Sequence, residues 1–545
     1  MVHEMANGTR DRSEDASLAQ RIRDTQTRLR AALKPRYDFI VCGSGSSGSV
    51  VARRLAENPA VSVMLLEAGG SDDIDSVLKV EQWPRNLGSA TDWQFVAEAN
   101  PHLNGRSIPM NMGKVLGGGS SINVMMWARG HKDDWDHFAA EAGDPAWGYE
   151  AVLDIYRRIE DWRGAPDPDR RGTGSLVYVE PAPNPHQVAT DLLDAAGTVG
   201  LPVFGSHNGA MMEGEGGVSI ADIRARAGIR QSVFRSYTYP YMDRPNLTVL
   251  TDALVTKVTV QDKRATGVEI AYGGATHRIE AGSEVVLSLG AIHTPKVLMH
   301  SGIGDHAELA RLGIAPVQNL PGVGRNMQDH PGIACVWESP QPLVPRNTAG
   351  EATYLWKSNP AVGTPDIQTC QSEIAAASAE NAARFGLPAA GWTLNVGVVR
   401  PESRGSVRLT GSSPTDPVRI DANLLAEPAD LAAAVSGVEL CREIGNARPL
   451  RSHRKREVMP GNLTGRELER FVRDGALTYW HQSCTAKMGR DEMSVVDGHL
   501  RVYGIERLRI ADASIMPRVT TGNTMAPCVI IGERAAQLLK DAHGL

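Results

Sequence analysis

The sequence lacks several features that would assign it to a particular class of protein at once. It has no apolar run of 18 residues, and its start, MVHEMANGTRDRSED, holds no hydrophobic segment for export, so it predicts neither a membrane span nor a signal peptide. Its formal net charge of -6 gives no reason to expect nucleic acid as a partner. We therefore expect a soluble, cytoplasmic protein.

Cysteines and metal-ligand patterns are also sparse. The 6 cysteines are scattered, without a CxxC pair, which favours free thiols in a reducing compartment over a disulfide framework. The stretch 130–137, GHKDDWDH, gathers histidines and aspartates, but their spacing does not place three of them on one helical face, as a tetrahedral site requires. We expect no bound metal.

The length of the chain, in contrast, predicts more than one domain. A chain of 545 residues exceeds one ordinary hydrophobic core. Residues 1–36 form an extension in which 17–33 carry leucine and isoleucine at helical intervals among mainly basic polar positions. A membrane-surface helix and a helix packed on the body or on a partner subunit are both open. The narrow apolar face without an aromatic anchor favours the packed helix.

A glycine-rich turn lies between an expected strand and an expected helix near the start of the chain. The apolar run 37–42 precedes GSGSSG at 43–48, and helical spacing follows to residue 57. Gly43 permits a tight turn, Gly45 lets backbone approach a pyrophosphate, and Gly48 lets the helix pack closely with its N-terminus facing the phosphates. This order of elements indicates dinucleotide binding.

Glu67 completes this dinucleotide pattern. A second apolar run, 61–66, ends at Glu67, which follows the last glycine of the turn by about 20 residues. An acidic residue at this distance is expected to meet the ribose hydroxyls. The pattern does not separate NAD from FAD.

Two further glycine-rich elements follow. Residues 113–130 read GKVLGGGSSINVMMWARG, and residues 290–304 read GAIHTPKVLMHSGIG. Consecutive glycines and serines bring backbone against a flat or charged ligand. The second element follows an expected strand at 284–289 and opens a helix, with Pro295 early in it. Both elements are therefore expected to face one ligand.

These two elements resemble the paired signatures of the glucose-methanol-choline (GMC) oxidoreductases, FAD-dependent enzymes that act on alcohols. The resemblance extends to 37–70, 401–409 and 508–527. Within the family, the motif style is nearest to enzymes that act on 5-hydroxymethylfurfural, aryl alcohols and choline. The resemblance implies FAD, and it implies a small-molecule alcohol as substrate with O2 or another electron acceptor.

The resemblance also implies the fold, α/β and α+β overall. A Rossmann-like FAD-binding domain is expected from 37–330, discontinuously, and 480–545, with a helix at 529–539. A second, substrate-binding domain, built on an antiparallel sheet, is expected from 331–479 and an inserted part of 150–210. The apolar runs 333–338 and 393–400 predict two of its strands. The sequence leaves open whether the protein forms a homo-oligomer.

The expected cofactor contacts follow residue by residue from the family signatures. They are Gly43, Gly45, Ser46, Ser47, Gly48, Glu67, Ala68, Gly113, Val115, Gly119, Asn123, Val124, Met125, Val255, Gly290, Trp480, Asp512, Ala513, Thr524 and Met525. Some family members attach FAD covalently through a histidine at the position of Ile122. We therefore expect noncovalent FAD.

The expected catalytic pair is His481 and Asn523. The resemblance places His481 at the family's catalytic histidine and Asn523 at its partner position. Alcohol oxidation removes a hydroxyl proton and moves a hydride to flavin N5, so a base is needed near the hydroxyl. An imidazole with the ordinary pKa near about 6.5 is largely neutral at neutral pH and can accept that proton, and the amide of Asn523 can donate to the alkoxide. Trp480 is expected to contact both flavin and substrate.

Two other functions are compatible with this sequence. The family scaffold also serves hydroxynitrile lyases and light-driven fatty-acid decarboxylases, in which FAD is not turned over in the same way as a redox carrier. A nonenzymatic flavin-binding protein is a third alternative, disfavoured by the intact pair His481 and Asn523. The sequence does not separate an oxidase from a dehydrogenase, nor does it identify the alcohol.

Overall fold

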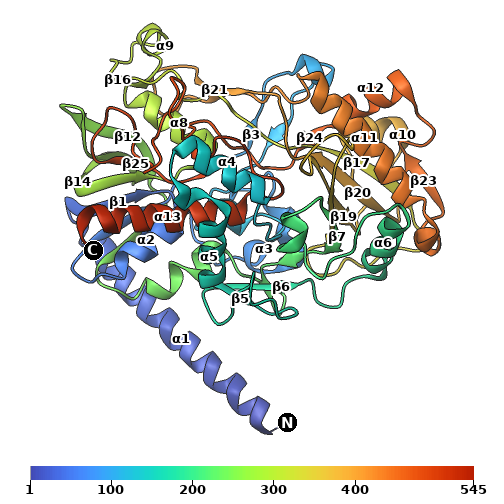
Figure 1. Cartoon of the computed structure of the whole chain (residues 1–545). Helices are drawn as coiled ribbons and strands as arrows, with labels where there is room; N and C mark the ends of the chain where they lie inside the picture. Colours follow the sequence, from blue (N-terminus) through green and yellow to red (C-terminus); the bar gives the residue numbers. More distant parts are fainter. Residues whose placement is uncertain (1) are drawn as a thin grey trace.

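The computed structural model describes residues 2–545, which are organised around two large sheets (Figure 1). The first sheet has the order β11-β2-β1-β14-β13-β12, with β25 beside β14. Its strands are β1 (Arg36–Cys42), β2 (Val63–Leu66), β11 (Leu247–Leu250), β12 (Leu254–Gln261), β13 (Arg264–Tyr272), β14 (Ala275–Leu287) and β25 (Leu508–Ile510). The strands β11, β2, β1 and β14 run parallel, whereas β12, β13 and β14 form an antiparallel meander.

Helices from both ends of the chain cover this first sheet. Helix α2 (Gly48–Ala56) follows β1 and packs beside α13 (Met525–His543), as Figure 1 shows near the C-terminus. The predicted helix at 529–539 is confirmed but longer. It starts earlier because Pro527 fits a first helical turn, and it ends where Gly544 takes a left-handed conformation. Helix α8 (Gly290–His300) confirms the helix that the glycine-rich element at 290–304 was predicted to open.

The second sheet is antiparallel, as predicted, with the order β23-β17-β20-β19-β18-β7 and β24 beside β17. Its strands are β7 (Gly217–Ile220), β17 (Pro331–Glu338), β18 (Ala352–Trp356), β19 (Ile367–Ser372), β20 (Gly391–Val398), β23 (Arg456–Met459) and β24 (Leu477–Thr478). Trp337 and Trp392 stack across β17 and β20 with ring centroids 4.5 Å apart. The predicted strands at 333–338 and 393–400 are therefore confirmed in position.

Helices α6 (Gln187–Thr198), α11 (Pro428–Gly445) and α12 (Gly465–Gly475) pack against the second sheet. Strand β7 joins that sheet although its residues fall inside the range 37–330 predicted for the other domain. Between α4 (Lys132–Ala142) and α6, helix α5 (Tyr149–Ile159) leads to a separate small sheet of β5 (Glu160–Trp162), β6 (Val177–Pro181) and β8 (Asp222–Ile223). The predicted domain ranges stay a prediction.

Helix α1 (Val2–Ala31) covers the edge of the first sheet with its C-terminal part. The Gln26 amide donates to the Leu247 carbonyl at 2.9 Å, and its oxygen accepts from the Val249 N–H at 2.9 Å. This side chain thereby satisfies the free edge of β11, which would otherwise be open to pairing. Figure 1 shows the N-terminal part of the helix projecting from the body. None of the helices within residues 2–545 has both the length and the apolar character needed to cross a bilayer.

Candidate active site

A cavity lies at the carboxyl ends of the parallel strands of the first sheet and reaches the segment after β24. It holds about 1530 Å³ of space not filled by protein atoms, its opening to solvent included. It is lined by almost all of the predicted site residues: Gly43, Gly45, Ser46, Ser47, Glu67, Ala68, Gly113, Gly119, Ile122, Asn123, Val124, Val255, Gly290, Trp480, His481, Asp512, Ala513, Asn523, Thr524 and Met525. Gly48, Val115 and Met125 do not line it.

The first turn can be built only from glycines at its two ends. Gly43 has φ +97°, and a Cβ there would lie 2.2 Å from the carbonyl oxygen of Ser288 after β14. Gly48 does not line the cavity, and a Cβ there would lie 1.9 Å from the carbonyl oxygen of Gly43, so only glycine lets the helix pack this closely against the turn. A Cβ on Gly45 meets no protein atom within 4 Å. The middle of the turn therefore faces open space, as approach to a pyrophosphate requires.

Glu67 is already engaged with this turn. Its carboxylate accepts from the N–H of Ser44 at 3.1 Å, from the Ser44 hydroxyl at 2.6 Å and from the N–H of Gly69 at 2.9 Å. Burial raises the pKa of Glu67, although these hydrogen bonds act in the opposite direction and lower it. Its position at the end of β2 on the cavity wall is as predicted, while the contact with a ribose stays a prediction.

Polar side chains hold the other loops of the cavity. The carboxylate of Asp512 accepts from the Gly290 N–H at 2.9 Å and from the Thr294 hydroxyl at 2.5 Å, which ties the segment after β25 to the start of α8. Asn123 accepts from Arg230 at 2.8 Å and from the N–H of Met125 at 3.0 Å. We call the glycine turns after residues 43, 113 and 290, with these ties, the cradle.

His481 and Asn523, which are 42 positions apart, meet in the cavity. Nδ2 of Asn523 lies 3.3 Å from Nε2 of His481. His481 is 6% exposed, and burial lowers its pKa to about 3. The expectation from the sequence used the ordinary imidazole pKa, and the structure corrects it downward. His481 is therefore neutral at neutral pH, and a proton placed on it is poorly solvated.

His330 is a neighbour that sequence reasoning missed. Its Nδ1 lies 2.8 Å from Nδ1 of His481, and the two rings meet edge to face. The contact arises because β24 pairs with the start of β17, which brings residue 330 beside Tyr479. Burial also lowers the pKa of His330 well below its ordinary value. With 15 histidines in the chain, only this strand pairing distinguishes His330.

Asp329, also missed, joins both histidine segments. Its Oδ1 accepts from the backbone N–H of His330 at 2.8 Å and from that of His481 at 2.9 Å, and the Thr478 hydroxyl donates to Oδ2. Burial raises the pKa of Asp329 to about 7. We call Asp329, His330, His481 and Asn523 the polar cluster.

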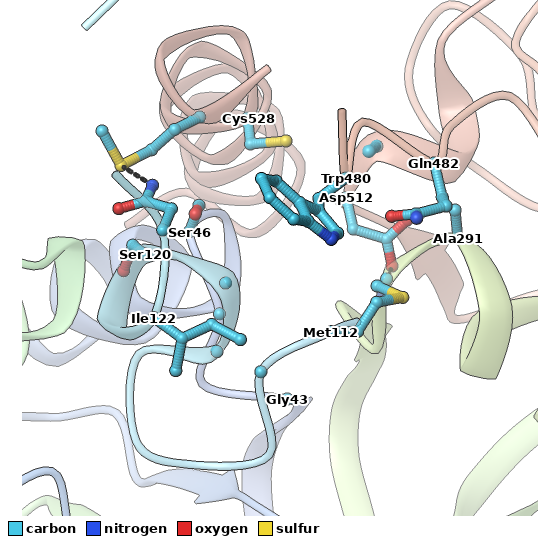
Figure 2. Close-up of a pocket in the computed structure, with 18 of the residues that line it drawn as sticks. Gly43, Ser46, Met112, Ser120, Ile122, Ala291, Trp480, Gln482, Asp512 and Cys528 are labelled. Carbon is cyan, nitrogen blue, oxygen red and sulfur yellow. Dashed lines mark hydrogen bonds between the residues drawn. The ribbon is translucent and has the colours of Figure 1, made fainter. Parts of the chain in front are cut away.

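Aromatic side chains line the wall beside the polar cluster. Figure 2 shows the indole of Trp480 projecting between the side with Ser46 and Ile122 and the side with Met112 and Gln482. Trp480 is 39% exposed, and its Nε1 donates to Asn111 at 3.1 Å. Nearby on the cavity wall, Trp93 and His293 have ring centroids 4.0 Å apart. The wall can therefore accept a flat ring.

Family models match most of the chain. A family model described as GMC oxidoreductase matches residues 37–332. A second model with the same description, for the C-terminal part of these proteins, matches residues 401–532. The chain is 33% identical over 534 residues to the alcohol dehydrogenase [acceptor] of Pseudomonas putida, covering 92% of this chain and 95% of that protein. It is 36% identical to the choline oxidase of Arthrobacter globiformis, covering 93% and 95%.

The fold leads to the same family. The crystal structure of pyridoxine 4-oxidase from Mesorbium loti superposes with a TM-score of 0.88 at 30% identity, covering 93% of this chain and 99% of that one. The paired glycine signatures and the histidine beside the cavity lie within the residues that the two family models match. The chain therefore belongs to the GMC oxidoreductase family.

Proposed function

We propose that this protein is an FAD-dependent oxidoreductase that oxidises an alcohol, preferably a primary one, to the aldehyde or ketone. The observation that carries the proposal is the neutral His481, whose Nε2 lies beside the amide of Asn523 on the wall of a cavity that the cradle also lines. The relatives with known names act, by those names, on alcohols, choline or pyridoxine. The members of this family are FAD-dependent.

The cradle fits FAD. The open space at Gly45 and the N-terminus of α2 suit the pyrophosphate, and Glu67 lies where a ribose is expected. Asn123, Asp512 and Thr524 also line the cavity and would hold the ring. Bound FAD supplies the acceptor for the hydride that leaves the alcohol carbon.

FAD is held without a covalent bond in this proposal, because Ile122 lines the cavity where some family members carry the linking histidine. Acid precipitation of the purified holoenzyme tests this directly. We expect all of the yellow colour in the supernatant. Flavin retained on the denatured polypeptide would contradict noncovalent binding.

Two residues of the polar cluster act on the substrate hydroxyl group in different ways. His481 accepts the hydroxyl proton at Nε2, for which a neutral imidazole is needed, and burial secures that neutrality. Asn523 donates to the oxygen as negative charge develops there, and it does so without titrating. The low pKa of His481 has a second consequence: the proton must leave or be balanced by nearby negative charge, because a buried imidazolium is costly.

The wall beside the polar cluster favours an aromatic or heteroaromatic alcohol. The half-exposed indole of Trp480 offers a ring face, while the carboxyl group of Asp329 is occupied by backbone donors and does not face a cationic head group. Aromatic contacts of this kind contribute about 0.5–1.5 kcal/mol each.

A screen of alcohols under air and under argon with an artificial dye tests the proposal. Peroxide formed under air would identify an oxidase, and dye reduction under argon with no peroxide under air would identify a dehydrogenase. Both results require aldehyde or ketone as product. Cleavage of a cyanohydrin, or decarboxylation of a fatty acid under light, without oxidation of any alcohol would instead support a lyase on this scaffold.

A further inference from the structure

A buried glutamine of the second sheet forms a hydrogen bond to the side-chain oxygen of Asn523. Gln368 on β19 is fully buried, and its Nε2 donates to Oδ1 of Asn523 at 3.2 Å. The same Nε2 lies 3.3 Å from Oγ1 of Thr353 on the neighbouring strand β18. Both hydrogens of the Gln368 amide therefore have an acceptor, one on each side.

The direction of these bonds is set by a backbone carbonyl. The hydroxyl of Thr353 donates to the carbonyl oxygen of Thr369 at 3.0 Å, and a carbonyl can only accept. With its single proton directed at that carbonyl, the hydroxyl oxygen of Thr353 accepts from Gln368. Gln368 then presents its NH2 group toward Thr353 and Asn523, and its own oxygen is buried without a hydrogen-bond partner among the described residues.

The same logic continues to the histidine. Because Oδ1 of Asn523 accepts from Gln368, its NH2 group faces Nε2 of His481 at 3.3 Å. Nε2 must accept and therefore carries no proton. The single proton of the neutral ring then lies on Nδ1, which donates to Nδ1 of His330 at 2.8 Å.

We propose that Gln368 is a positioning residue that fixes the tautomer of His481, through Asn523, so that the unprotonated Nε2 faces the cavity. The inference rests on the proposed function, because a free Nε2 matters only if a hydroxyl proton is removed. The titratable group that faces Gln368 is His481, across Asn523. The other contacts of the Gln368 amide, Thr353 and the sulfur of Met126, carry no charge.

The variant Gln368→Glu tests the direction of the chain of hydrogen bonds. An ionised carboxylate can only accept, so it turns the amide of Asn523 around, places Oδ1 against His481 and forces the proton onto Nε2. A protonated carboxyl group donates to Oδ1 and restores the original arrangement. We expect flavin reduction on the order of 10²-fold slower than in the wild type at pH 9, the loss of one well-placed donor. The deficit shrinks as the pH falls toward 5, since burial raises the pKa of the introduced group.

A ligand titration gives a readout that does not depend on turnover. Benzoate, an aromatic carboxylate, accepts from the Asn523 NH2 group, and its binding is followed by the absorbance change of the bound flavin. We expect its Kd at pH 9 to rise at least about tenfold in Gln368→Glu and to stay unchanged in Gln371→Glu, an equally buried position on the opposite face of β19. If the wild type oxidises no alcohol, the proposed function fails, while this titration still reports on the amide.

A second pair of variants covers the case in which Gln368→Glu loses FAD or does not fold. Thr353→Val removes the hydroxyl that sets the direction, and Thr353→Ser keeps it. We expect flavin reduction several-fold slower in Thr353→Val and near the wild-type rate in Thr353→Ser. Equal rates in both, or a pH-independent deficit with unchanged benzoate affinity in Gln368→Glu, would overturn the proposal.

Discussion

The cradle and two members of the polar cluster, His481 and Asn523, line the same cavity, but the two regions are built in opposite ways. In the cradle, backbone does most of the work, and each turn is a contiguous run of residues that follows a strand or starts a helix. In the polar cluster, side chains do the work, and the two histidines in contact are 151 positions apart in sequence. The cradle is suited to hold a ligand that many proteins share, and the cluster to act on one group of a particular substrate.

The two regions also differ in the titratable groups that they hold. Burial raises the pKa values of the cradle's acids, Glu67 and Asp512, as it does for Asp329, but only the cluster adds a pair of imidazoles in contact. The cluster contains an acid whose pKa burial raises and two imidazoles whose pKa values burial lowers, so that all three titratable groups are driven toward their neutral forms. In their neutral forms these groups can still accept and donate protons, but the cluster carries no fixed charge that would attract water. This difference predicts that substitutions in the cluster change chemistry, and that substitutions in the cradle change cofactor binding.

The largest expected effect is in the cluster. His481→Ala removes the base, and we expect anaerobic flavin reduction by alcohol to slow by a factor of about 10²–10⁴ with FAD still bound. His277→Ala, on the exposed part of β14, serves as the control and should keep the wild-type rate. Unchanged reduction kinetics in His481→Ala would remove this residue from the mechanism.

The matching change in the cradle is Gly48→Ala. The new Cβ would lie 1.9 Å from the carbonyl oxygen of Gly43, so the turn must shift, and we expect the purified protein to contain less than about a tenth of the wild-type FAD. Gly197→Ala in α6 meets no atom within 4 Å and should keep its FAD and gain slightly in stability. A Gly48→Ala protein with full FAD content and slow chemistry would break the division between the two regions.

Asp329→Asn tests the electrostatics of the cluster. The carboxyl group has a pKa of about 7 in the folded protein, well above its usual unfolded value, so the folded state retains a proton between about pH 4 and pH 7 that the unfolded state has lost. This carboxyl group therefore favours folding least at the upper end of that window. Relative to the wild type, the free energy of unfolding of the variant should rise with pH by up to about 1.4 kcal/mol per unit.

Urea unfolding at several pH values measures that difference. A constant offset between the two proteins across pH 4–7 would show that Asp329 is ionised in the folded state. In that case the cluster carries a negative charge and is not a neutral site.

The smallest expected effect concerns the wall between the two regions. Trp480→Ala should raise KM for benzyl alcohol about 2- to 10-fold and leave KM for a small aliphatic alcohol nearly unchanged, because only the ring loses a stacking partner. Trp480→Phe keeps an aromatic face, so its KM for benzyl alcohol should lie between those of the wild type and Trp480→Ala. Equal increases for both alcohols would assign Trp480 to cofactor binding instead of substrate choice.

Sequence reasoning found most of the cradle, because strand, glycine turn and helix follow one another in the turns after residues 43 and 290 and because the family signatures supplied the remaining positions. Of its residues, Gly48, Val115 and Met125 lie behind the cavity, since a motif does not tell which way a residue faces. In the cluster, only His481 and Asn523 were found, through family signatures. Asp329 and His330, and Gln368 behind the cluster, were missed because the pairing of β17 with β24 and the position of β19 are long-range features.

The central claim is that the polar cluster removes a hydroxyl proton while a flavin in the cradle takes up the hydride. Anaerobic mixing of the wild-type holoenzyme with a primary alcohol, such as benzyl alcohol, tests this in a single turnover. We predict loss of the flavin absorption near about 450 nm together with one aldehyde per flavin. A flavin that stays oxidised with every alcohol of the panel, in a protein that retains its FAD, would contradict the claim.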